Sequence, residues 1–296
     1  MAIIPNRKIW FIFSGALLVL SIIALSLWGL KPGIDFTGGS LLELKFQNLP
    51  VSTDVAVILT EMNLEAPAIQ TAPGNIMVLR FKSVTEEVHQ ALIQKFKDKF
   101  SEVEEVRFDS IGPTIGQELF KRAILAVIFV TLMILVYIAW SFRHVSRPVP
   151  AWVYAVIVII AFLHDVTIPI GLFAYLGHFM GWEIGSPFIA AVLTILGYSI
   201  SDTIVVLDRV RENIKKLRGT FEEIVEASVH QTITRSLNTS VTTMLALFAI
   251  LIFGGASLQG FALALLVGIF FGTYSSIFIA APLLITWHHF KNHKRR

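Results

Sequence analysis

Three ionisable side chains lie inside long apolar stretches of the sequence and are the first candidates for chemistry. Asp165, Asp202 and Arg235 each fall in a run long enough to cross a bilayer. A charged group inside a membrane span costs about 2.5–3.5 kcal/mol on insertion scales, so we treat each of them as a functional candidate. A carboxylate in this setting is typical of a proton relay. The alternative is a structural aspartate that is hydrogen-bonded to a neighbouring helix.

Asp202 is the sharpest of these candidates. It precedes Asp208, which we place at the cytoplasmic surface, by six residues. At 1.5 Å per residue, Asp202 is therefore expected about 9 Å below that surface. Thr194, Tyr198 and Ser201 share its helical face, so we expect this polar face to point into a helix bundle instead of into lipid. Proton relay and structural bonding both remain open for Asp202.

Arg235 lies near the cytoplasmic end of the fifth apolar stretch. Asn238 and Thr239 continue its helical face at i+3 and i+4. One interpretation is a snorkelling arginine that anchors the span. The other is a partner for Asp202, because both residues are expected within about two turns of their cytoplasmic ends. A pair whose contact forms and breaks could load and release a proton.

Asp165 lies near the middle of the third apolar stretch, next to His164. A histidine beside a buried carboxylate is a composition found in proton paths. Adjacent helical residues point about 100° apart, so the two side chains need not share a face. The sequence leaves two roles open for Asp165: a secondary relay, or a polar contact that locks the third and fourth spans together.

Nothing else in the sequence points to catalysis, a metal or a cofactor. There is no cysteine, which excludes disulfides, thiolate metal sites and a cysteine nucleophile. His288, His289 and His293 resemble a metal-binding tract, but a solvated basic tail explains them without a fixed ligand geometry. We therefore expect a protein that is not an enzyme and that uses no cofactor.

The composition indicates a membrane protein with one soluble insertion. Of 296 residues, 55% are hydrophobic and 15% charged, against about 25% charged in soluble domains. Residues 31–122 hold 10 Lys/Arg and 13 Asp/Glu, whereas the other 204 residues hold only 22 charges. These numbers exclude an ordinary soluble enzyme, a disordered protein and a nucleic-acid-binding domain. We expect domains at 1–30, 31–122 and 123–296.

Six apolar stretches are long enough to span a bilayer as helices. They run roughly over Ile9–Leu30, Ala123–Trp140, Ala151–Tyr175, Pro187–Leu207, Thr232–Phe253 and Phe261–Trp287. The two tails and two alternate short loops carry 13 Lys/Arg, and the opposite short loops carry none. All six tryptophans fall at or near span ends, where indole is enriched. The positive-inside rule then predicts cytoplasmic termini and an outward-facing segment 31–122.

The outward segment reads as a small α/β domain. Strands are expected at Leu41–Phe46, Ala68–Thr71, Ile76–Phe81 and Val103–Phe108, with helices over Thr53–Met62, capped by Ser52 or Thr53, and from a Ser83–Glu86 capping box to about Phe100. The order β-α-β-β-α-β is ferredoxin-like. We expect residues 36–110 to fold alone.

Glycines and one amphipathic segment complete the pattern. Gly33, Gly38 and Gly39 follow the first span and are candidates either for a hinge or for a tight turn. Gly268 and Gly272 form a GxxxG pair that favours close helix packing. Residues 220–229 are read either as an interfacial helix or as the first turns of the fifth span.

Several motifs together resemble the SecF family, the smaller subunits of the bacterial SecD–SecF protein-export complex. They are GIDFTGGS (Gly33–Ser40), RFDSIGPTIGQEL (Arg107–Leu119), LHDVTI (Leu163–Ile168), ILGYSISDTIVVLDRVREN (Ile195–Asn213), RSLNTSVTT (Arg235–Thr243) and FGGASLQGFALALLVGIFFGTYSS (Phe253–Ser276). The first motif alone does not separate SecF from SecD, and the fourth is much more specific. Ser201 stands where the family commonly has asparagine.

The resemblance implies a role in protein export. It implies six spans, an outward domain after the first, and SecD as the pseudo-symmetric partner half. It further implies that proton flow pulls or releases exported unfolded polypeptide outside the bacterial inner membrane, after the SecYEG channel and SecA have begun translocation. In the family an intramembrane Asp–Arg pair is associated with proton passage, and its positions match Asp202 and Arg235 here. The rival readings are a proton-driven small-molecule exporter and a scaffold subunit without proton chemistry.

Overall fold

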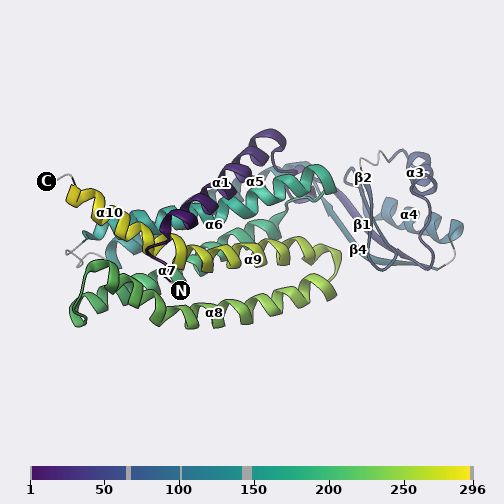
Figure 1. Ribbon diagram of the computed structural model, residues 1–296. Helices are drawn as coiled ribbons and strands as arrows, with labels where there is room; N and C mark the ends of the chain where they lie inside the picture. The colour runs from purple at the N-terminus through teal and green to yellow at the C-terminus, as the bar shows by residue number, and fades with distance from the viewer. Residues whose placement is uncertain (1, 65–67, 101, 142–148, 294–296) are drawn as a thin grey trace. The chain divides into compact units, whose positions relative to one another are not determined.

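The computed structural model describes residues 2–64, 68–100, 102–141 and 149–293. Two compact units divide the chain (Figure 1). The helical unit comprises Met1–Lys31 and Ala126–Arg296, and the sheet unit comprises Pro32–Leu125.

The helical unit is built from long, apolar helices. They are α1 (Arg7–Trp28), α5 (Pro113–Ser141, from Ala126 onward), α6 (Ala151–Met180), α7 (Ser186–Lys216), α8 (Phe221–Phe253), α9 (Ala256–Ser275), the π-helix η1 (Ser276–Ala280) and α10 (Ala281–His293). In the described residues, six helices are long and apolar enough to cross a membrane: α1, α5, α6, α7, α8 and the continuous run Leu258–Lys291. The number of spans therefore agrees with the sequence pattern.

The helices extend beyond the apolar stretches that predicted them. α5 begins at Pro113, well before the expected Ala123, because proline suits the first helical turn. α8 begins at Phe221, so the amphipathic segment 220–229 is the start of the fifth span and not a separate interfacial helix. A capping box opens α8, with the Glu223 N–H donating to Thr220 Oγ1 (3.3 Å) and the Thr220 N–H donating to Glu223 Oε2 (2.8 Å).

α9 lies among the other helices of this unit and packs against α6, α7 and α8 (Figure 1). A Cβ atom at Gly268 would overlap the side chain of Ile195 on α7, and one at Gly272 would lie 3.1 Å from Ser199 Cβ. The two glycines therefore allow α9 to approach α7 closely. α1 approaches α6 in the same way, because a Cβ at Gly171 would overlap Ser21.

The sheet unit holds one four-stranded antiparallel sheet. Its strands are β1 (Gly39–Phe46), β2 (Ala68–Ala72), β3 (Ile76–Phe81) and β4 (Val103–Ile111), in the spatial order β2-β3-β1-β4. The helices are α2 (Ile34–Thr37), α3 (Ser52–Glu61) and α4 (Glu86–Lys99). Alternate strand residues and the apolar stripes of α3 and α4 form a single core, which includes Leu42, Leu79, Leu59 and Phe96. In the chain, the sheet follows α1 and precedes α5, the second candidate span.

Some local predictions in the sheet unit were wrong. α4 begins at Glu86 with Thr85 at its N-cap, so Ser83 does not cap it. The N-cap of α3 is Val51, with no side-chain cap bond, so neither Ser52 nor Thr53 has that role. In both cases the residue with extended backbone dihedrals just before the helix occupies the cap, whatever its side chain.

The glycines after α1 have distinct roles. Gly38 (φ 75°) and Gly39 (φ 133°) adopt backbone conformations that favour glycine. A Cβ at Gly38 would lie 2.6 Å from Pro113 Cα, and one at Gly39 would lie 2.9 Å from the Phe81 carbonyl oxygen. Gly33 has an ordinary φ of −83° and is the N-cap of the short helix α2. The geometry therefore gives Gly38 and Gly39 a turn-forming role, and their role as hinges stays a prediction.

Candidate functional site

Asp202 lies where three helices of the helical unit meet. On α7, it accepts hydrogen bonds from Ser236 of α8 and from Ser276 of η1. The Ser236 Oγ–Asp202 Oδ1 distance is 2.5 Å, and Ser276 Oγ donates to Asp202 Oδ2. Asp202 is only partly buried, whereas both serines are buried. The carboxylate is thus held by two neutral hydroxyl donors from separate helices.

Arg235 does not pair with Asp202 in this structure. Among the residues that the structure describes, no ion pair joins the two side chains, although Arg235 is within electrostatic range of the carboxylate. Arg235 precedes Ser236, and adjacent helical residues point about 100° apart. Since Ser236 faces Asp202, Arg235 is turned outward and is exposed. The expected contact is therefore absent from this conformation.

Asp165 occupies a second, wholly buried polar site. Its Oδ1 lies 2.8 Å from His164 Nδ1, and its Oδ2 accepts from Ser199 of α7 and from Ser275 of α9, the latter at 2.7 Å. Asp165 is 0% exposed and His164 2%. The structure therefore brings the adjacent side chains of α6 together and links the third span to the fourth and sixth. Such bonding suits a structural lock and leaves the relay role open.

A short chain of hydroxyl groups adjoins Asp202. Tyr198 Oη lies 2.9 Å from Ser240 Oγ, and Ser240 is hydrogen-bonded to Thr273. Ser240 Oγ also donates to the carbonyl oxygen of Ser236 at 2.8 Å. Of these residues, only Tyr198 was a candidate from the sequence.

The other predicted polar residues face outward in this chain. Ser201, Asn238 and Thr239 are exposed. Thr239 Oγ1 donates to the Arg235 carbonyl oxygen at 3.0 Å, a bond within α8. These residues do not reach the Asp202 carboxylate here. They are exposed polar residues on helices that are otherwise apolar enough for a membrane.

Sequence reasoning missed the serines that hold the two carboxylates. Ser199, Ser236, Ser275 and Ser276 lie inside or at the end of motifs already noted, but serine is common in membrane helices as a small packing residue. Ser276 entered the sequence analysis only as the last residue of the motif Phe253–Ser276. The serines could have been predicted from the sequence, because hydroxyl residues occur in three apolar stretches at about the same depth as an intramembrane carboxylate.

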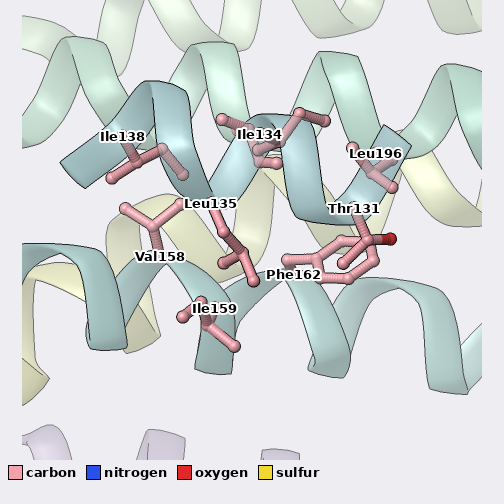
Figure 2. A pocket seen from close by; sticks show the side chains of 9 residues that line it. Thr131, Ile134, Leu135, Ile138, Val158, Ile159, Phe162 and Leu196 are labelled. Carbon is pink, nitrogen blue, oxygen red and sulfur yellow. The ribbon is translucent and has the colours of Figure 1, made fainter. Parts of the chain in front are cut away.

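An apolar pocket in the helical unit, lined by residues of α5, α6 and α7, is separate from these sites. Figure 2 shows side chains from α5, α6 and α7 around it, including Ile134, Val158, Phe162 and Leu196. Its only hydroxyl, on Thr131, donates to the Val127 carbonyl oxygen at 2.7 Å. The lining therefore offers no group for acid–base chemistry. No cluster of His, Cys, Asp or Glu suited to a metal ion occurs among the described residues.

Comparison with known proteins gives the family. Residues 91–290 match the family described as "Protein export membrane protein SecD/SecF, C-terminal", and residues 29–48 match the "SecD/SecF GG Motif". A relative from Anaerolinea thermophila, named Protein translocase subunit SecF, is 40% identical over 96% of this chain and 93% of its own length. The chain belongs to the SecF family.

Further relatives agree with this assignment. The SecF subunit of Haemophilus influenzae is 36% identical over 94% of this chain and 83% of its own. The crystal structure of SecDF from Thermus thermophilus, described as a translocon-associated membrane protein, has a TM-score of 0.84 and 33% identity. It covers 98% of this chain, which spans only 39% of that longer chain. Family membership and six apolar helices identify a multi-pass membrane protein.

Proposed function

We propose that this protein is an accessory subunit of the Sec translocase that couples the proton-motive force to late steps of protein export across the bacterial inner membrane. The observation that carries the proposal is the bonding of Asp202. In the described part of the chain, its carboxylate has hydroxyl donors and no ion-pair partner. It can therefore gain or lose a proton without the cost of breaking a buried salt bridge.

Arg235 is proposed as the partner that tunes this carboxylate. Its exposed position leaves it free to approach Asp202 in another conformation and to withdraw again. A permanent pair would hold the carboxylate charged and stop proton loading, whereas a contact that alternates permits both loading and release. The planar guanidinium suits this task better than an ammonium, since it can bond both carboxylate oxygens.

SecD is proposed as the partner that covers the exposed polar residues of α7 and α8. Ser201, Arg235, Asn238 and Thr239 are exposed on α7 and α8, and polar groups of membrane helices are costly against lipid. A second polypeptide or a water-filled path should therefore cover them. Two solved relatives are SecDF proteins, of which this chain spans 39% and 40%. We infer that SecD supplies the covering half, and that the assembly acts with SecYEG and SecA on exported unfolded polypeptide.

The sheet unit is proposed to face outward and to guide the emerging polypeptide. The charge distribution of the loops favours cytoplasmic termini, and a segment as long as residues 31–122 can translocate despite its own charges. The strand order β2-β3-β1-β4 within the element order β-α-β-β-α-β supports a ferredoxin-like domain in this position. The segment that begins at Gly33 and turns at Gly38 and Gly39 follows the first span in the chain and leads into β1.

The two rival functions require different features of the protein. A small-molecule exporter needs a pocket with polar groups for its substrate, and the apolar pocket of the helical unit offers only the Thr131 hydroxyl. A scaffold subunit needs no titratable carboxylate at all. Neither proposal nor rival involves covalent chemistry on a substrate.

The test is proton-gradient-dependent release of a secreted protein from membranes carrying Asp202→Asn. Asparagine keeps the shape and one oxygen acceptor but cannot release a proton, so we expect release to fall to the level seen when a protonophore collapses the gradient. Asp208→Asn is the matched control, because Asp208 lies on the same helix but is exposed and paired with Arg211 at 3.3 Å.

Three results bear on the roles. Asp202→Glu should keep part of the activity, since a carboxyl survives. Arg235→Lys should release less of the secreted protein than the wild type does, although lysine keeps the positive charge, because the planar guanidinium is lost. If Asp202→Asn releases at the wild-type rate and at normal protein level, the proton mechanism is wrong and the scaffold function takes first place.

A further inference from the structure

Two consecutive serines bond the two carboxyl sites of the helical unit, of which one is fully and the other partly buried. Ser275, the last residue of α9, donates to Asp165 Oδ2 at 2.7 Å. Ser276, the first residue of η1, donates to Asp202 Oδ2. Asp165 belongs to α6 and Asp202 to α7, so neighbouring residues of one helix reach carboxylates on two others. Both serines are fully buried.

Each serine hydroxyl has two acceptors for one proton. Ser275 Oγ also lies 3.1 Å from the Gly272 carbonyl oxygen, and Ser276 Oγ lies 2.9 Å from that of Thr273. A hydroxyl has a single O–H and can rotate it to suit its surroundings. Toward an ionised carboxylate it donates. Toward a protonated carboxyl it can accept, and its own proton then turns to the backbone carbonyl.

These carbonyls lie where the helix changes its geometry. The Ser276 N–H donates to the Gly272 carbonyl, and Ser276 is also the first residue of the five-residue π-helix Ser276–Ala280. π-turns occur mostly as short interruptions in α-helices, frequently at functional sites. Side-chain bonds to carbonyls in the preceding turn compete with the helical ladder and bend helices. Rotation of the two hydroxyls therefore changes the bonding of the backbone at this turn.

We propose that Ser275 and Ser276 are positioning residues that act as a hydroxyl switch, linking the protonation states of Asp165 and Asp202 through the π-turn of the sixth span. The proposal rests on the proposed role of Asp202 as the proton site. It adds that the protonation of Asp165 shifts when Asp202 gains or loses its proton. The backbone hydrogen bonds of the sixth span change at the same time.

Other titratable groups near the two carboxyls are few. Arg235 of α8 acts on Asp202 electrostatically, and Tyr198 reaches the same region through Ser240. His164 bonds Asp165 directly, and Tyr274 of α9 stacks on the His164 ring at 6.1 Å. In the described part of the chain, α1 and α10 send no hydrogen bond or ion pair from a titratable side chain to either carboxyl. Direct charge coupling between the two carboxyls is thus the main competitor of the switch.

The test is an infrared pH titration of the protein, assembled with its proposed partner SecD, in vesicles. The acid C=O band of each carboxyl is assigned with Asp165→Asn and Asp202→Asn. We expect Asp202→Asn to displace the titration midpoint of Asp165 by about one pH unit, the size at which two sites titrate as a coupled pair. In the Ser276→Ala and Ser275→Ala backgrounds this displacement should vanish, whereas direct charge coupling would survive both changes.

A matched variant controls for the loss of a buried hydroxyl. Ser228 of α8 is also fully buried and bonds the Ile224 carbonyl and Asn213, away from both carboxyls. Ser228→Ala should keep the coupling. Ser276→Cys, nearly isosteric but a poor donor, should lose it while keeping the fold.

Two outcomes would overturn the proposal: no displacement in the wild-type background, or an undiminished displacement in both serine variants. Export is scored separately. Normal export by Asp202→Asn would refute the proposed function without altering the spectroscopic result.

Discussion

Asp165→Ala should destabilise the protein far more than Asp202→Ala does. In the wild type, Asp165 bonds His164 Nδ1, Ser199 and Ser275 at a site with no solvent exposure. Ser275 keeps an acceptor in the Gly272 carbonyl, but Ser199 and His164 Nδ1 lose their partner. Each buried polar group left unsatisfied costs about 1–3 kcal/mol, so we expect a loss of roughly 2–6 kcal/mol.

The same truncation at Asp202 has a smaller expected cost. Ser276 keeps the Thr273 carbonyl as an acceptor, so only Ser236 loses its partner. Asp202 is partly exposed, and water can replace part of what is lost. We therefore expect a loss of about 1 kcal/mol or less. Since native proteins are stable by only about 5–15 kcal/mol, Asp165→Ala approaches the limit of folding while Asp202→Ala does not.

The assay is thermal unfolding of the purified complex, read by the fraction that stays monodisperse after heating. A difference of several kcal/mol corresponds to a difference of many degrees in midpoint for a chain of this size. Ser199→Ala provides the internal check, because it removes one of the two orphaned groups. In the Ser199→Ala background, Asp165→Ala should cost less than it does alone. Equal midpoints for the Asp165→Ala and Asp202→Ala variants would refute the ranking of the two sites by burial and bonding.

Three other predictions address the topology and the sheet unit. A reporter active only outside the cytoplasm should be active when fused after Gly74 and silent after Lys216, and the reverse pattern would refute the proposed orientation. Burial raises the pKa of Glu43 above its usual 4.5, so the free energy of unfolding should fall as pH rises from about 4.5 through the raised value. Urea unfolding of the separately expressed sheet domain should show this fall, and the Glu43→Gln variant should lack the part that Glu43 contributes. Gly38→Ala should lower the melting temperature of the full chain, because its φ is 75° and Pro113 leaves no room for a Cβ, whereas Gly33→Ala, at a φ of −83°, should not.

The number of spans was predictable because the hydrophobicity of a segment indicates directly whether lipid or water surrounds it. The ends of the helices were not, because a helix continues until a residue stops it. Between Phe221 and Phe253 there is neither glycine nor proline, so α8 runs unbroken through both its amphipathic and its apolar part. α5 likewise begins at Pro113, in a polar stretch before its apolar run.

The strand order in the chain was predictable from alternation and turn residues, but the caps were not. A side chain that can cap is only a candidate until the backbone places it next to the first turn. Thr85 holds that place for α4, and its side chain makes no cap bond. The short helix α2 escaped prediction because four residues are too few for a periodic pattern.

The candidate site shows the same limit at the level of side chains. Asp165 and Asp202 look alike in the sequence, since each is an aspartate within an apolar stretch. What separates them is the number of donors around each carboxyl and the access of water, and both depend on how α6, α7 and η1 pack. Gly268 and Gly272 fix the approach of α9 to α7, and so they set which serines reach which carboxylate. Local spacing predicts the presence of an intramembrane carboxylate, whereas only the packing of separate helices decides whether it is locked or free to titrate.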